Sequence, residues 1–296
     1  PEDFGALLAD LDRVIVPGLT HSFERPALRV FERPVVDLDA GSGTAIIKKA
    51  HAAGAKVIDY DRLTLGGGAD YYVSFDNSAV GKLQGDGLVK CLEGTTKPVV
   101  AELNGSPTDN NATLFAKGYN GVLDPLYADG SYVKGPNQSV PDWDNQKALT
   151  IFEQMLAKTS NKIDAVLAAN DGLGNAAISA LKARKLKQIP VTGQDATAQG
   201  IQNILAGDQC MTVYKAVKAE AEAASELAIA LAKGETPTTA TGSTENEGTQ
   251  TPSVLLKPVT VTKENIQDTV IKDGFLTTDE ICTGKYAKLC TDAGIS

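Results

Sequence analysis

Polar and charged residues follow most of the predicted strands. In an open parallel sheet the loops after the carboxyl ends of the strands converge, and ligands bind there. An N-cap or a turn explains any one of these positions equally well. Because nearly every strand end carries such a residue, the set as a whole predicts a polar binding site. Its members are Asp61 and Arg62, Asp76 and Asn77, Asp109, Asn110 and Asn111, Asn170 and Asp171, Gln194 and Asp195, and Lys215.

These side chains suit a ligand that is rich in hydroxyl groups. Carboxylates, amides and a guanidinium fork match the spacing of adjacent hydroxyls on a sugar ring, and an aromatic ring covers its apolar C–H face. The charges of the four ionic candidates sum to zero, which fits an uncharged ligand better than a phosphate or a carboxylate. These four are Arg62, Asp109, Asp195 and Lys215.

Trp143, the only tryptophan, lies in the loop-like stretch VPDWDNQ before a predicted helix. It is the candidate platform for a sugar ring. The alternative is that it packs the following helix against the core.

Signs of catalysis are sparse. His21 and His51 are the only histidines, and His51 lies in an amphipathic helix, where a solvated or hydrogen-bonded role is expected. The chain has no GxSxG, HExxH or GxxxxGK[ST] motif and no strand followed by GxGxxG. Asp142 and Asp144 flank Trp143 and could act as glycosidase acid and base, although a turn explains them as well. We predict no catalytic residue, no metal site and no cofactor.

The composition is that of a globular protein. The chain has 296 residues, of which 42% are hydrophobic and 22% charged, and a net charge of -9, which excludes disorder and a collagen-like fold. This charge repels phosphate backbones, so nucleic acid is not an expected partner. No apolar run reaches the ~18 residues of a membrane span. The first residues lack the layout of a signal peptide, so we expect a cytosolic protein or one whose targeting segment was removed.

The four cysteines bear on the compartment. Cys282 and Cys290 lie eight positions apart around a glycine, with no histidine nearby to complete a zinc set, which predicts a local disulfide. Cys91 and Cys210 are each either a buried small hydrophobe or a bonded residue, and the sequence does not pair them. A disulfide would indicate an oxidising, extracytoplasmic location.

From about residue 44 the chain alternates helical segments, turn signals and short β-branched runs. This alternation predicts an α/β fold with parallel sheets flanked by helices. The segment from Thr236 to Gln250 lacks periodicity and is expected to be a loop, followed by one last strand in SVLLKPVTV. Because the length is near the limit of one core, two lobes are predicted. We expect lobe 1 to span 1–103 plus about 215–252, and lobe 2 to span 104–214 plus about 253–296.

The strand ends resemble those of the type I periplasmic sugar-binding proteins of ABC transporters, and specifically the D-xylose-binding branch. The resemblance runs from about Ala45 to Phe275. It implies two Rossmann-like lobes, linked by hinge crossovers, that close on a monosaccharide and hand it to a membrane permease. The matching segments are VIDYDRL, YYVSFDNSAVGKLQ, GSPTDNNATLF, NKIDAVLAANDGLGNAAISAL, TGQDA, MTVYK and ENIQDTVIKDGF.

The resemblance also implies a ligand set and a location. Trp143 falls near the stacking aromatic of the family, and Asn110 and Asp171 adjoin the matching positions. The ligand is expected to be D-xylose or a related pentose or hexose. The protein is expected to be a monomer in the periplasm, or a cell-surface lipoprotein after removal of a signal segment. The implied pocket residues are Arg62, Asp109, Asn111, Asn170, Asp195 and Lys215.

The front of the chain departs from this pattern. Members of the family open with about two further βα units before the segment that begins here at Asp39, and they place a pocket arginine in the first strand-to-helix loop. Residues 1–38 are too few for those units. Arg25 is the nearest candidate for that arginine.

Two other classes of protein remain as alternatives. A ligand-sensing transcription regulator shares the two-lobe fold, but it should carry a helix-turn-helix and a basic face, and this acidic chain shows neither. A sugar-processing enzyme is the third class, and the two histidines and the missing motifs count against it.

Overall fold

The computed structural model describes residues 14–15 and 40–295, and these divide into two compact units. Unit 1 holds the described residues before 77 together with Thr108–Asn111 and Val217–Leu256. Unit 2 holds Asn77–Pro107, Ala112–Ala216 and residues 257–295. The sequence placed the first boundary after residue 103, whereas residues 77–103 group with unit 2. The reason is packing, because the helix at 77–91 contacts strands of unit 2 and the strand at 99–104 lies at the centre of its sheet.

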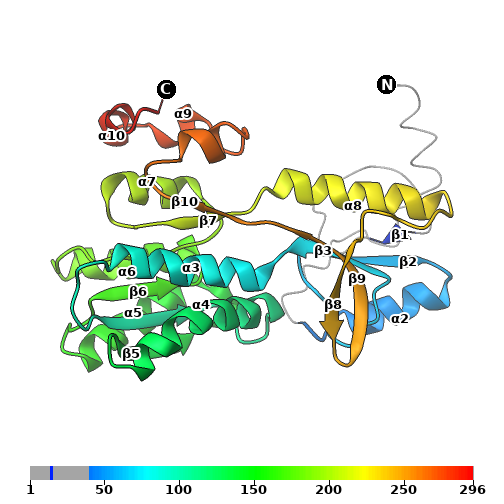
Figure 1. The fold of residues 1–296 in the computed structure, drawn as a ribbon, viewed down its shortest axis with the longest axis horizontal. Coiled ribbons are helices and arrows are strands. Elements are labelled where there is room, and N and C mark those ends of the chain that lie inside the picture. Colours follow the sequence, from blue (N-terminus) through cyan, green and yellow to red (C-terminus); the bar gives the residue numbers. More distant parts are fainter. Residues whose placement is uncertain (1–13, 16–39, 296) are drawn as a thin grey trace. The chain divides into compact units, whose positions relative to one another are not determined.

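Unit 1 is built on a five-stranded sheet with the order β1-β2-β3-β9-β8 (Figure 1). The first four strands in this order run parallel, and β8 pairs antiparallel with β9. The strands are β1 (Val14–Ile15), β2 (Lys56–Tyr60), β3 (Tyr71–Phe75), β8 (Gly242–Asn246) and β9 (Thr249–Leu256).

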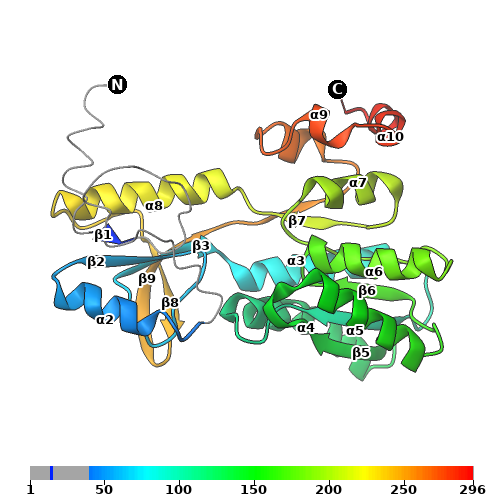
Figure 2. The same cartoon turned by 180° about the vertical axis from the view of Figure 1, so that it is seen from behind.

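Helices cover both faces of this sheet. Side chains alternate between faces along a strand, so Val57 packs with Ile47 of α2 (Thr44–Ala52). The next residue, Ile58, packs with Leu227 of α8 (Val217–Ala232). Figure 2 shows α2 and α8 on opposite sides of the strands. The alternation of apolar residues thus fixes which face of the sheet each of these two helices covers.

The prediction of a loop at 236–250 is wrong in part, because this segment contains β8 and the start of β9. Glu247 and Gly248 both have positive φ, of 48° and 85°, which is the backbone that a two-residue hairpin turn requires. The hairpin therefore extends the parallel sheet with an antiparallel edge strand of low hydrophobicity.

Unit 2 contains a three-stranded parallel sheet with the order β5-β4-β6. Helices α5 and α6 cover one face, where Leu103 and Val166 pack with Phe152 and Leu173. The apolar run IPVTG, residues 189–193, forms only an isolated parallel bridge, Val191 to Val166. The elements are β4 (Val99–Asn104), α4 (Asn110–Ala128), β5 (Val133–Ser139), α5 (Asn145–Lys158), β6 (Ala165–Ala168) and α6 (Asp171–Ala183).

The rest of unit 2 forms a second cluster around an antiparallel pair, β7 and β10. The run SVLLKPVTV was expected to be one strand, but it is divided at Lys257 and Pro258 between β9 of unit 1 and β10 of unit 2. The segment KENIQDTVIK that follows contains a short π-helix over Gln267–Ile271. The remaining elements are α3 (Asn77–Cys91), α7 (Ala198–Ala206), β7 (Thr212–Tyr214), β10 (Val259–Val261), α9 (Thr278–Ile281) and α10 (Tyr286–Asp292).

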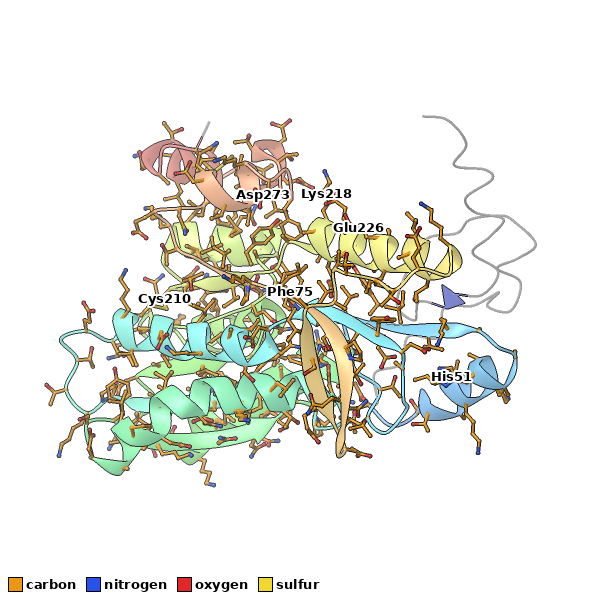
Figure 3. The ribbon with its side chains drawn as sticks, turned by 45° about the vertical axis from the view of Figure 1, so that its right-hand side comes forward. His51, Phe75, Cys210, Lys218, Glu226 and Asp273 are labelled. Carbon is orange, nitrogen blue, oxygen red and sulfur yellow. A yellow bond between two sulfur atoms is a disulfide. The ribbon has the colours of Figure 1, made fainter. Side chains whose placement is uncertain are left out.

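Two disulfides lie in unit 2. Cys282 and Cys290 are joined between α9 and α10, where the sequence predicted a bridge. Cys91 and Cys210 are also joined, which ties the last residue of α3 to the segment before β7. Figure 3 labels Cys210 beside α3. Within residues 40–295, none of the helices combines the length and the apolar character that a bilayer span requires.

Candidate functional site

In unit 1 the candidate residues gather after β2 and at the start of α4. Arg62 Nη2 lies 3.2 Å from Asp109 Oδ2. The carboxylate is almost fully buried, with 3% of its side chain exposed, and the guanidinium side chain is 31% exposed. The pair thus presents a partly accessible fork of donors whose charge is balanced by a buried carboxylate.

The backbone that carries Arg62 is held by its neighbour. Asp61 has φ 61°, and its carbonyl oxygen accepts hydrogen bonds from Tyr72 Oη at 3.1 Å, Ser74 Oγ at 2.8 Å and Asn111 Nδ2 at 3.0 Å. Three donors on one carbonyl explain how a left-handed residue persists at this strand end. The sequence suggested a ligand contact for Asn111, and the structure gives its amide nitrogen this bond to the arginine loop.

The start of α4 is ordered by Asp109. Its Oδ1 accepts a hydrogen bond from the backbone N–H of Asn111 at 2.9 Å, so the same carboxylate caps the helix and pairs with Arg62. Asn111 is buried and Asn110 is half-buried. The three residues Asp109–Asn111 therefore form one fixed polar turn.

In unit 2 the corresponding ion pair is Lys215 with Asp195. Lys215 Nζ lies 3.3 Å from Asp195 Oδ1, and the lysine side chain is 14% exposed against 37% for the aspartate. Lys215 directly follows β7, and Asp195 follows the bridge residue Val191. Both units thus carry one pair of opposite charges in loops after strands.

Asn170 lies at the carboxyl end of β6, where it is the N-cap of α6. Its Oδ1 accepts from the backbone N–H of Leu173 at 2.9 Å, and this bond fixes the side chain. The amide nitrogen Nδ2 carries two hydrogens that the cap does not use, and these can donate to a ligand. Asn170 is half-buried, so the capping and binding roles are compatible.

Trp143 follows β5 in a turn with φ 56° and is half-buried. Its ring lies over Gly105, where a Cβ would stand 2.1 Å from Trp143 Cη2. It also meets Phe115 edge-on, with ring centroids 6.4 Å apart. Only glycine at position 105 allows this approach, so the ring is a fixed surface that packs on the core and keeps an exposed part.

Asp171 was a candidate ligand residue, but the structure places it in the interior with 0% exposure. Its carboxylate accepts from Gln209 Nε2 at 2.8 Å, Thr212 Oγ1 at 2.8 Å and Thr197 N at 2.7 Å. Burial raises the pKa of Asp171 to about 6, against the lowering effect of these hydrogen bonds. At neutral pH it is therefore a buried carboxylate, out of reach of a ligand.

The acid and base pair considered for a glycosidase has other partners. Asp144 is the N-cap of α5, and hydrogen bonds from the backbone of Lys147 and Gln146 lower its pKa. Asp142 pairs with Lys147 Nζ at 2.6 Å. A carboxyl group with a lowered pKa is a poor general acid, so the turn interpretation fits better.

His51 on α2 is hydrogen-bonded through Nε2 to Asp70 Oδ2 at 2.9 Å and is 39% exposed (Figure 3). This is the hydrogen-bonded surface role expected for it. Arg25 and His21 lie outside the described residues. Among residues 40–295, no three or more His, Cys, Asp or Glu side chains are placed to hold a metal ion.

Sequence reasoning missed Gln84 of α3, which supports the site in unit 2. Its Nε2 donates to the carbonyls of Ala168 at 3.2 Å, Ala169 at 3.0 Å and Gly193 at 3.2 Å. These contacts join the loop of Asn170 to the loop of Asp195. A glutamine inside a helical pattern is indistinguishable from a surface residue until the fold is known.

Comparison with known proteins places the chain in a family. Residues 35–236 match the model of the periplasmic binding protein domain. The D-xylose-binding periplasmic protein of Haemophilus influenzae is 43% identical over 239 residues, which cover 80% of this chain and 70% of that protein.

Solved structures agree with this match. A carbohydrate transporter solute-binding protein from Chloroflexus aurantiacus, in complex with D-glucose, is 32% identical with a TM-score of 0.75, and the match covers 82% of this chain and 78% of that one. An ABC transporter solute-binding protein from Clostridium phytofermentans with bound β-D-glucose is 31% identical with a TM-score of 0.76. This match covers 82% of this chain and 80% of that one. These relatives are binding proteins and not enzymes. The chain belongs to the periplasmic binding protein family.

Proposed function

We propose that this protein binds a monosaccharide, D-xylose or a closely related pentose or hexose, and delivers it to an ABC importer. The observation that carries the proposal is the balanced ion pair after strands of each unit, Arg62 with Asp109 and Lys215 with Asp195. Each pair offers fixed donors and acceptors without net charge, which suits the hydroxyls of a neutral sugar. The resemblance to proteins named for D-xylose and solved with D-glucose supports the same ligand class.

The remaining residues have distinct roles in this proposal. Asn170 donates from Nδ2, and Trp143 stacks on the C–H face of the ring. Asn110 and Asn111 supply or support polar contacts at the start of α4. Arg25 would add a second guanidinium group that donates hydrogen bonds to the sugar. The two lobes expected from the sequence would close on the sugar, as the family resemblance implies.

The same proposal covers location and partners. The two disulfides fit an oxidising compartment, and we propose an extracytoplasmic protein, periplasmic or anchored at the cell surface. The partner is the membrane permease of an ABC importer. The protein is proposed to act as a monomer with no catalytic step and no cofactor.

A thermal-shift panel of pentoses and hexoses, followed by calorimetry on the best ligand, tests the proposal. A sugar that binds only the native state raises the melting temperature by mass action. Asp195→Ala and Asp109→Ala should each weaken binding by about 2 to 4 kcal/mol, because each removes a sugar-facing acceptor and the carboxylate that holds the neighbouring cation in place. Asp86→Ala removes an exposed carboxylate that is paired with Lys82 and serves as the control. Flat melting curves across the panel, or wild-type affinity in both site variants, would contradict the proposal.

A further inference from the structure

Asp171 is buried next to the loop that carries Asp195, and the sugar-binding role gives it no task. Its two carboxylate oxygens accept four hydrogen bonds. Oδ2 accepts from both the N–H and the Oγ1 of Thr197, at 2.7 and 3.0 Å. Oδ1 accepts from Gln209 Nε2 and Thr212 Oγ1, each at 2.8 Å. A buried carboxylate that accepts four hydrogen bonds can hold the groups that donate them in fixed positions.

The loop beside it has an unfavourable backbone. Asp195 has φ 93° and Ala196 has φ 49°, and neither is a glycine, so this conformation persists only where surrounding contacts impose it. Asp195 N donates to Val213 O at 2.9 Å, which holds one side of the loop to β7. The backbone amides of the next two residues are held by contacts with Thr212 and Asp171.

A single hydroxyl links the strained residues to this carboxylate. Ala196 N donates to Thr212 Oγ1 at 3.2 Å, and the same Oγ1 donates to Asp171 Oδ1. Thr197 N then donates directly to Asp171 Oδ2. The two amides that follow Asp195 are therefore both fixed, one through Thr212 and one directly.

Two glycines of the same segment enclose the carboxylate. A Cβ on Gly193 would lie 2.0 Å from Asp171 Oδ1, and a Cβ on Gly200 would lie 2.2 Å from Oδ2. Neither position leaves room for any other residue while Asp171 keeps its place. The backbone of residues 193–200 is thus folded closely around this one side chain.

We propose that Asp171 is a positioning residue for Asp195, because its buried carboxylate imposes the left-handed backbone that brings the Asp195 side chain to Lys215. The inference rests on the proposed sugar-binding role of Asp195. It assigns to Asp171 control of affinity without contact with the sugar. Removing the anchor leaves Asp195 present but no longer held at 3.3 Å from Lys215.

The test uses two substitutions of similar shape in the full chain, Asp171→Asn and Thr212→Val. Asp171→Asn turns one acceptor into a donor that faces donors, and Thr212→Val removes the hydroxyl between Ala196 and Asp171. We expect each to weaken binding of the best sugar of the panel about tenfold or more. Ile178→Ala on the same helix α6 lowers stability away from the loop and should keep wild-type affinity.

A double-mutant cycle separates an effect on the position of Asp195 from a general loss of structure. In an Asp195→Ala background, Asp171→Asn should change affinity less than about threefold, since the group that it positions is already gone. An equal loss in both backgrounds would overturn the proposal.

Hydrogen exchange of the sugar-free protein measures directly how firmly the backbone amides of this loop are held. The amides of Ala196 and Thr197 should exchange at least about tenfold faster in Asp171→Asn, while amides in the middle of α5 keep their rate. Unchanged exchange at these two amides would refute the positioning role. If the wild-type protein binds no sugar, the proposed function fails, and the exchange rates still decide the role of Asp171.

Discussion

Lys215 Nζ and Asp195 Oδ1 are 3.3 Å apart, and the lysine is the more deeply buried partner of this pair. Removal of the carboxylate therefore takes the Asp195 counter-charge away from an ammonium group that has little access to water, whereas removal of both charges creates no such imbalance. We expect Asp195→Ala to lower the free energy of unfolding by about 1 to 3 kcal/mol. The double variant Asp195→Ala, Lys215→Met should recover most of this loss. Urea unfolding measures both free energies, and a double variant no more stable than Asp195→Ala would contradict this electrostatic explanation.

Arg62→Lys tests the guanidinium fork in unit 1. A lysine keeps the charge beside Asp109 but loses the planar set of donors, so sugar affinity should fall by about 1 to 2 kcal/mol while the melting temperature stays near that of the wild type. Calorimetry gives the affinity. Arg184→Lys, at an exposed arginine that bonds Asn161, is the matched control, and an equal effect of the two changes would remove the special role of Arg62.

Trp143 is a built-in probe because it is the only tryptophan. Stacking on a sugar should produce a saturable change in its fluorescence, and Trp143→Ala should cost roughly 1 to 3 kcal/mol of binding. The ring also packs on Gly105 and Phe115, so the variant should melt at a lower temperature. Trp143→Phe restores part of the packing. Normal calorimetric affinity in a folded Trp143→Ala protein would refute the stacking role.

Asp171 should make stability fall as pH rises from about 4 to 6. Its pKa in the folded protein is about 6, above the ordinary value of 3.8, so the folded state holds the proton more tightly than the unfolded state does. The favourable contribution is fully present below pH 3.8 and is lost as pH rises through 6, with an upper limit on the order of 3 kcal/mol.

This contribution is isolated by subtracting the unfolding free energies of Asp171→Asn from those of the wild type between pH 4 and 7. Subtraction is needed because hydrogen-bonded carboxyls with lowered pKa, such as those of Asp70 and Glu280, change stability in the opposite direction. A difference that does not vary with pH would show that burial leaves the pKa of Asp171 unraised.

The two disulfides should differ in their effect on stability. Cys91 and Cys210 close a loop of 119 residues, and Cys282 and Cys290 one of 8. In the chain-entropy model, their removal costs about 5 and about 2.5 kcal/mol. Alanine replacement of each pair followed by urea unfolding measures these losses, and a peptide map of the non-reduced protein should show both links. A larger loss from the shorter bridge would contradict the entropic ordering.

Much of the architecture was predictable because parallel strands and their helices have strong local patterns. The buried run in β6 and the cap at Asn170 follow from apolar residues that end at a polar one. The β8–β9 hairpin was not predictable in the same way, because β8 (GSTEN) and the first half of β9 (TQTP) are polar. They belong to the sheet only because β9 pairs with β3 and β8 pairs with β9.

The candidate site shows the same limit. Strand-end positions identify which residues stand in the loops, but not which way each one points. Asn170 and Asp171 are adjacent and chemically alike, yet one is half-buried and the other fully enclosed. The pairing of Cys91 with Cys210 likewise depends on α3 lying beside the segment before β7, a contact between residues far apart in the chain.

The position of β9 next to β3 has a consequence for biosynthesis. Residues 72–75 pair with residues 253–256, so one edge of β3 has no strand to pair with until residues 253–256 have left the ribosome. During that interval the edge is open to pairing with other chains. A growing chain of this design benefits from a chaperone or from transport in an unfolded form, and its yield should depend more on how it is handled during synthesis than on its final stability.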